Sequence, residues 1–271
     1  MKNRFALILI AAGACLACVT AANAGQRCDT AKPTPRVIER GLNLAQRTAA
    51  ALDAEHRQHG TRVVLLARAG QDLSKYGQHW SHVGWAYKTA EGQWRVVHKL
   101  NECGTDQSLI TRQGLGEFFL DDLWRYEAAW APPPPELQDA LWKLLQDNRR
   151  APALHQRRYS MVSYAWGTRY QQSNQWAIET LALAAEPQVQ RREQAQAWLR
   201  LKDYRAATLR IGALTRLGGR MTAGNVAFDD HPNAQRFADR IETVTADSVL
   251  DWLQRLSAGG AAPRVALLAG S

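Results

Sequence analysis

Two alternating runs joined by a short turn limit the possible folds of this 271-residue chain more than any other feature. In residues 78–88, His82, Gly84 and Ala86 share one face, and larger side chains occupy the positions between them. Alternation with a period of two is typical of a β-strand. The turn 89–92 ends in a glycine and leads into 93–100, so the two runs predict an antiparallel hairpin.

The remaining patterns predict an α+β protein. Apolar residues at helical spacing predict helices over residues 33–56, 136–146, 173–185, 191–201 and 245–256. Further strands are expected at 62–69, 126–131 and 206–211, a short helix or loop at 115–123, and a break at 217–219. We therefore expect a single domain over 25–256, with a small antiparallel sheet packed against helices. An Ala/Gly-rich tail, 257–271, is expected to be loose.

The first 24 residues have the pattern of a secretory signal peptide. A basic start precedes an apolar stretch, and Ala22-Asn23-Ala24 fits a cleavage site. Cleavage there predicts a periplasmic or secreted protein with no transmembrane span in the mature chain. A lipoprotein anchored through Cys15 is the alternative, which the leader disfavours because it lacks a suitably placed leucine.

Two cysteines, Cys28 and Cys103, follow the predicted cleavage site. An even count in an oxidising compartment predicts a disulfide between them. The alternative is that Cys103 is a free nucleophile.

The net charge of the chain is +9. Such a charge favours an anionic neighbourhood, for example a cell-wall polymer or a membrane surface, although an arginine-rich composition without a specific partner also explains it. The basic residues are scattered and no nucleic-acid motif accompanies them, so we expect no nucleic-acid partner.

Ser173 begins a polar run that opens a predicted helix. A hydroxyl at a helix N-terminus lies near backbone N–H groups that stabilise an anion, so Ser173 is a candidate nucleophile, with Gln172 and Asn174 as supporting donors. The structural alternative is that Ser173 is an ordinary helix cap.

His82 is the candidate general base. Its small neighbours on the same strand face leave room for an approaching group, and His98 or Asn101 on the returning strand could orient its ring. The alternative is a buried histidine that is bonded to the backbone.

Asp229, Asp230 and His231 form a second polar cluster. The two carboxylates beside a histidine could bind a metal or orient a catalytic histidine, but Asp230 before Pro232 also suits a capped helix entry. No metal-binding spacing accompanies them, so no metal or other cofactor is expected.

Several of these runs resemble a family of secreted Gram-negative bacterial proteins known only as a domain of unknown function. The resemblance is carried by residues 81–84, 94–104, 118–122, 173–176 and 225–232. It implies a periplasmic location and no known activity.

The order His82, His98, Ser173 also resembles, more distantly, the circularly permuted papain-like NlpC-type superfamily. In that group a strand histidine, a polar residue on the next strand and a cysteine at a later helix start form the active site. This resemblance implies a papain-like architecture with serine in place of cysteine. An alkoxide forms much less readily than a thiolate.

Two functional classes follow. The first is a periplasmic hydrolase of amide or ester bonds, in cell-wall peptides or lipids, with Ser173 as nucleophile and His82 as base. The second is a catalytically inactive binding protein that retains the groove.

Overall fold

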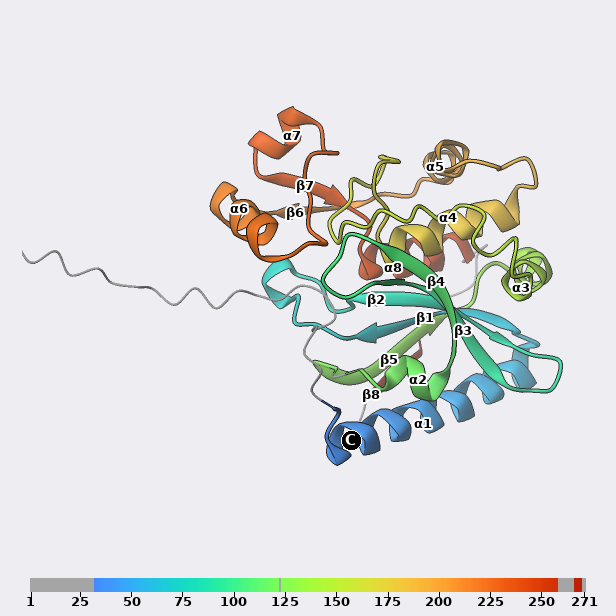
Figure 1. Cartoon of the computed structure of the whole chain (residues 1–271). Helices are drawn as coiled ribbons and strands as arrows, with labels where there is room; N and C mark the ends of the chain where they lie inside the picture. Colours follow the sequence, from blue (N-terminus) through green and yellow to red (C-terminus); the bar gives the residue numbers. More distant parts are fainter. Residues whose placement is uncertain (1–31, 122, 258–265, 270–271) are drawn as a thin grey trace, which may run out of the picture.

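The computed structural model of the chain describes residues 32–121, 123–257 and 266–269, and these residues form three layers. A six-stranded sheet lies between two helical layers (Figure 1). The α+β class and the antiparallel sheet packed against helices are confirmed.

The sheet has the strand order β4-β3-β2-β1-β5-β8, and every pairing in it is antiparallel. Its strands are β1 (Val63–Ala69), β2 (His82–Lys88), β3 (Trp94–Asn101), β4 (Ser108–Gly114), β5 (Arg125–Ala131) and β8 (Ala266–Ala269). The predicted hairpin is β2 and β3, with Trp85 opposite Val97. All of β1 is buried, because helices cover both of its faces.

One face of the sheet is covered by α1 (Pro35–His59) and α2 (Leu115–Phe119). Thr34 caps the start of α1, and Gly60 ends the helix in a left-handed conformation at φ 69°. Leu44 and Leu52 of α1 and Phe118 of α2 pack on strand residues of this face.

The opposite face carries α3 (Gln138–Gln146), α4 (Ser173–Ala185), α5 (Arg192–Leu201) and α8 (Ala246–Ser257). They enclose the larger apolar core, which includes Trp85, Trp176 and Trp252. Helix α4 lies at its centre, since its first eleven residues are all buried. None of the helices within the described residues combines the length and apolar character needed to cross a bilayer.

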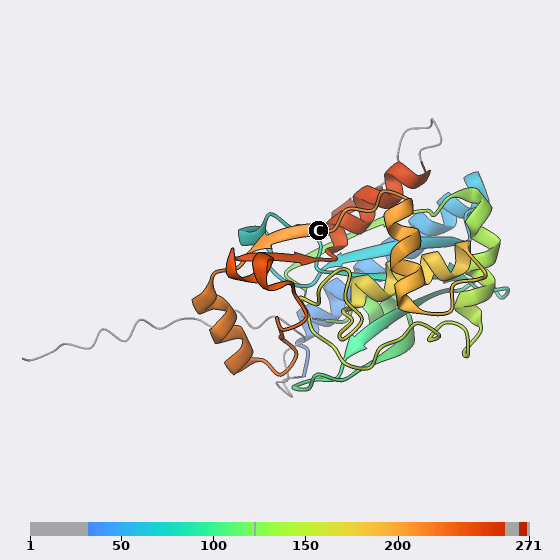
Figure 2. The same ribbon diagram turned by 90° about the horizontal axis from the view of Figure 1, so that it is seen from above.

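A small lobe lies at one end of the molecule. It consists of the β6–β7 ribbon (Ala207–Arg210 and Arg240–Thr243) with α6 (Ala213–Thr222) and α7 (Asn233–Phe237). Figure 2 shows α6 at the outer margin of the molecule, away from the central sheet. The core of the lobe is four buried side chains, Leu209, Ile211, Phe228 and Ile241.

The structure corrects several expectations. Strands β4 and β7 were not expected, and the break predicted at 217–219 lies inside α6. Part of the predicted loose tail, Ala266–Ala269, is β8 and pairs with β5. Asp230 does not cap α7, because Pro232 holds the cap position and the Asp230 side chain bonds elsewhere.

Cys103 is disulfide-bonded. Cys28, its predicted partner, lies outside the described residues, as does the predicted leader. The free nucleophilic thiol considered for Cys103 is therefore wrong.

Candidate functional site

The start of α4 carries a run of buried polar residues. Gln171, Gln172, Ser173, Asn174 and Gln175 are five successive polar residues, and each is at most 5% exposed. Burying polar groups without partners is costly, so the surrounding chain must satisfy them. Gln172, not Ser173, is the N-cap, since its side chain accepts a hydrogen bond from the Asn174 N–H at 3.1 Å.

The polar start of α4 lies where two strands separate. The pairing of β2 with β3 runs from Lys88–Trp94 to Trp85–Val97 and continues no further. Beyond it, the Val83 N–H donates to Asn174 Oδ1 at 3.0 Å, and Ser173 Oγ donates to the Lys99 carbonyl at 2.7 Å. The helix start therefore provides partners for strand groups that the ladder leaves unpaired.

Gly84 lies at this point of separation. A Cβ atom there would lie 2.7 Å from Val96 Cγ1 and 2.9 Å from His98 Cβ, closer than real contacts allow. Glycine is needed here because the Val96 and His98 side chains leave no room for a Cβ atom.

His82 and His98 meet on the other face of the sheet. His82 Nε2 lies 2.8 Å from His98 Nδ1, and both rings contact Phe118 of α2. His98 Nε2 lies 2.7 Å from Gln113 Oε1, while Gln113 Nε2 donates to Glu117. With the amide in this orientation, His98 donates from Nε2 and accepts at Nδ1, and His82 donates from its Nε2.

Both imidazoles are neutral at physiological pH. Burial, followed by the charge of Arg68, holds the pKa of His82 well below its ordinary value. The same two causes lower the pKa of His98 to about 3, against a smaller opposing effect of the Gln113 hydrogen bond. Arg68 is itself paired with Asp121 and donates to the Phe118 carbonyl.

The predicted pair of Ser173 and His82 is not assembled. Val83 and Trp85 face α4, and Trp85 Nε1 donates to the Ala177 carbonyl at 2.9 Å. Strand alternation directs His82 to the opposite face, where it contacts Phe118. Ser173 bonds the Lys99 carbonyl and lies 3.5 Å from the Tyr159 hydroxyl, and no hydrogen bond among the described residues joins it to His82.

His98 and Asn101 were the two candidates for orienting the His82 ring, and they lie in different surroundings. His98 lies behind His82 as expected, whereas Asn101 bonds the Thr105 and Gln107 carbonyls and accepts from Asn225. Asn101 is therefore not the group that orients His82.

Asp229, Asp230 and His231 do lie together. Asp230 accepts from His231 Nδ1 at 3.0 Å and from the Tyr164 N–H at 2.8 Å, and Asp229 pairs with Arg169 at 2.9 Å. These contacts join the cluster to the 164–169 loop. Within the described residues no group of three or more His, Cys, Asp or Glu side chains is arranged to hold a metal.

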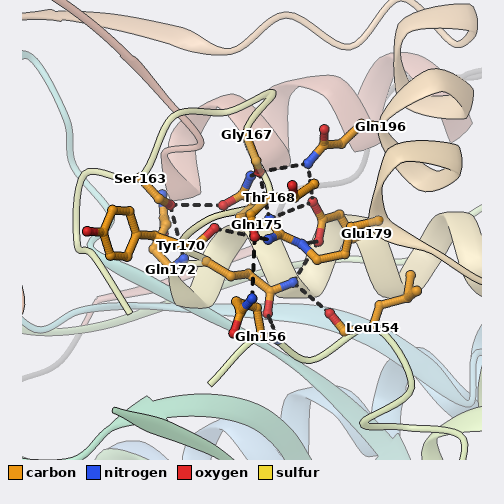
Figure 3. Close-up of polar contacts among 12 residues, drawn as sticks. Leu154, Gln156, Ser163, Gly167, Thr168, Tyr170, Gln172, Gln175, Glu179 and Gln196 are labelled. Atoms are coloured by element: carbon orange, nitrogen blue, oxygen red, sulfur yellow. Dashed lines mark hydrogen bonds and ion pairs between the residues drawn. The ribbon is translucent and has the colours of Figure 1, made fainter. Parts of the chain in front are cut away.

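A buried ionic network that sequence reasoning missed lies next to the start of α4 (Figure 3). Glu179 is fully buried and accepts two hydrogen bonds from Arg192, at 2.7 and 3.1 Å. Gln171 and Gln196 donate to the same carboxylate at 2.6 and 2.9 Å. Arg192 also donates to three backbone carbonyls of residues 167, 168 and 170, so the network fixes the long loop that covers α4.

Lys99, which is fully buried, joins this network through Gln171. Its Nζ donates to Gln171 Oε1 at 3.0 Å and to the Gln156 carbonyl at 2.5 Å. Burial, followed by the charge of Arg192, lowers the pKa of Lys99 to about 6, although Glu179 acts in the opposite direction.

One cleft lies beside this region, between β4 and the loop of residues 147–157, and we call it the β4 cleft. Its volume is about 320 Å³. It is lined by Val97, Glu102, Ser108, Leu109, Ile110, Thr111, Arg112, Asn148, Ala151, Pro152, His155 and Arg157. Sequence reasoning missed it because β4 carries no clear alternation and its opposite wall comes from a distant part of the chain.

Positive charge dominates the β4 cleft. Arg112 and Arg157 line it, against the single carboxylate of Glu102. Burial and the nearby charge of Lys99 lower the pKa of His155 to about 4. Ser108 Oγ lies 3.4 Å from His155 Nε2, but it donates its proton to the Arg157 carbonyl at 2.8 Å.

Comparison with known protein families matches residues 55–253 to the family described as "Uncharacterized protein conserved in bacteria (DUF2145)". The chain belongs to this family. The predicted membership of an uncharacterised bacterial family is thereby confirmed. No curated protein and no solved structure matches the chain.

Proposed function

We propose that this member of the family is a non-catalytic binding protein of the bacterial cell envelope, which holds an anionic ligand in the β4 cleft. The separation of Ser173 from His82 by the sheet carries the proposal. A serine nucleophile needs a base within hydrogen-bond reach, and here the base candidate faces the opposite helical layer.

Among the described residues, the Ser173 hydroxyl makes hydrogen bonds only to the Lys99 carbonyl and the Tyr159 hydroxyl, whereas the Lys99 amine itself donates to Gln156 and Gln171. The Tyr159 hydroxyl is the titratable side-chain group that hydrogen-bonds Ser173, and burial raises the pKa of that hydroxyl further. A protonated phenol does not remove a proton from serine. The Gln172 side chain also accepts from the first turn of α4, where an oxyanion would need free N–H groups.

The cellular location in this proposal rests on the leader and on Cys103. Disulfides persist in oxidising compartments, so the bonded state of Cys103 supports a periplasmic or secreted protein. The NlpC-type resemblance rests on three short runs. In this proposal it does not include the hydrolytic activity of that superfamily.

The ligand class follows from the lining of the β4 cleft. Two arginines in a partly enclosed volume favour carboxylates or phosphates, which their planar guanidinium groups recognise well. Peptides of the cell wall carry carboxylates and are the ligand we propose.

Labelling with a fluorophosphonate serine probe tests the absence of catalysis. We expect no labelling of the folded mature protein, so Ser173→Ala should give the same result as the unchanged protein. Ser108→Ala is the matched control, because Ser108 is also buried and also lies beside a titratable side chain, His155. Labelling at either serine would overturn the non-catalytic proposal and restore a hydrolase.

Calorimetric titration with soluble muropeptides tests the ligand site. Replacing both cleft arginines, in R112Q/R157Q, should weaken binding at least tenfold. The matched control R149Q/R150Q removes two exposed arginines of the same loop that do not line the cleft, and should bind like the unchanged protein. Equal binding by both double variants would remove the β4 cleft from the proposal.

A further inference from the structure

Helix α6 presents its apolar side to solvent. Leu214 is 85% exposed, Leu217 57% and Met221 78%, and the helix has no buried residue. These three positions are spaced by three and four residues, so they form one stripe. A surface helix normally turns such a stripe toward the core, and α6 has the reverse arrangement.

The inner side of α6 is polar. Arg216 Nη1 bonds Asp239 at 2.5 Å and also donates to the Ile211 carbonyl. An ion pair therefore attaches the helix to the lobe, and its apolar stripe is left without a partner among the described residues. Three adjacent large side chains differ from the scattered exposed apolar residues of an ordinary surface.

Arginines lie close to this stripe in the sequence. From Tyr204 to Phe228 the chain contains four arginines and no acidic residue. Arg205 is paired with Asp203 and Arg216 with Asp239, whereas no ion pair is seen for Arg210 or Arg220 among the described residues. Arg210 and Arg240, both exposed, are directly opposite each other in the β6–β7 ribbon. Like charges at opposed strand positions repel each other, and an anionic partner would relieve this repulsion.

We propose that α6 and the adjacent β6–β7 ribbon dock on a bilayer surface that carries anionic phospholipids. The apolar stripe would enter the boundary between headgroups and acyl chains, and Arg210, Arg220 and Arg240 would contact headgroup phosphates. The margin position of α6 leaves the stripe accessible to a flat surface (Figure 2). A symmetric dimer through the same face would bring the arginines of two copies together, which disfavours a second copy as the partner.

This surface lies outside the β4 cleft, and the inference stands whether or not the protein is catalytic. Co-sedimentation of the full mature protein with vesicles tests it. Vesicles with 30% phosphatidylglycerol in phosphatidylethanolamine should bind the protein at least tenfold more tightly than vesicles of phosphatidylcholine, and added salt should weaken the binding.

The double variant L214S/M221S should lower the affinity for anionic vesicles at least tenfold. Leu201→Ser is the matched control, because Leu201 is 81% exposed at the end of α5 and should have no effect. R210Q/R240Q should weaken binding and reduce its salt dependence. R112Q/R157Q should leave vesicle binding unchanged, which separates this inference from the cleft proposal.

Thermal unfolding of L214S/M221S should match that of the unchanged protein, so a loss of binding would not reflect misfolding. Three results would overturn the inference: no binding to anionic vesicles, equal affinity for phosphatidylcholine, or unchanged binding by L214S/M221S. A dimer that L214S/M221S converts to a monomer, with vesicle binding unaffected, would identify the stripe as a self-association surface instead.

Discussion

The start of α4 and the whole of α6 depart from the usual distribution of side chains in opposite directions. The start of α4 buries five successive polar residues, whereas α6 exposes three large apolar ones. The five polar side chains at the start of α4 are satisfied by the separated strands, the covering loop, residues 243–244 and the Glu179–Arg192 network. Further along the helix, Trp176 Nε1 and Thr180 Oγ1 are buried without a hydrogen-bond partner among the described residues. At α6 the small lobe offers no surface that could cover the stripe. Buried polarity here stabilises a particular tertiary arrangement, and exposed apolarity indicates an interaction.

The largest effect is expected for Glu179→Ala. It leaves the Arg192 guanidinium buried without its carboxylate, which should lower the free energy of unfolding by about 3–5 kcal/mol. Urea denaturation measures this change. Glu193→Ala, an exposed carboxylate in the first turn of α5, is the control and should cost less than about 1 kcal/mol. Similar losses for both variants would show that the network contributes little.

Gly84→Ala should lower the free energy of unfolding by about 1–3 kcal/mol, because its methyl group meets Val96 and His98 where the strands separate. Gly116→Ala is the control. Gly116 lies within α2, where an added methyl group would come no closer than 3.4 Å to Leu42. Alanine should therefore be neutral or stabilising there. Denaturation midpoints compare the two. A neutral Gly84→Ala would mean that the strands can move apart without cost.

Acid should destabilise the protein through His98. Its pKa is about 3 in the native state and near 6.5 when unfolded, so between these values the unfolded state binds the extra proton. Stability should therefore fall as the pH decreases from 6.5 toward 3, by up to about 1.4 kcal/mol per pH unit. His98→Gln should flatten this dependence in urea titrations, whereas the exposed His59→Gln should not. Identical pH profiles for the two variants would contradict the buried neutral state.

The smallest change in the free energy of unfolding is expected for a substitution in the exposed stripe of α6. Leu214→Ser should change the free energy of unfolding by no more than about 0.5 kcal/mol, because the side chain is already in water. Leu181→Ser, at a buried position of α4, should cost several times more, by loss of packing and burial of a hydroxyl. Thermal or urea unfolding of the two variants decides this, and a large loss at Leu214 would show that the stripe is part of the fold.

Local sequence patterns were sufficient to predict most of the helices and strands. The bounds of α4 agree with the predicted 173–185, and the β2–β3 hairpin follows from the alternation on either side of the turn. The same alternation correctly placed His82, Gly84 and Ala86 on one strand face. Strand β4 was missed because its side chains are mixed on both faces, and α6 was missed because Gly218 and Gly219 suggested a break.

The sequence by itself determined which residues form strands and helices and which residues of a strand share a face, since both depend on periodicity along a few neighbours. It also placed Ser173 at a helix start, but it left His98 and Asn101 as alternatives behind His82, and the structure has His98 there. Only the tertiary structure decided that α4 covers the face of the sheet opposite His82, and that β4 and the 147–157 loop enclose a cleft. Those outcomes depend on contacts between segments far apart in the chain, and no local pattern specifies which helix packs on which side of a sheet.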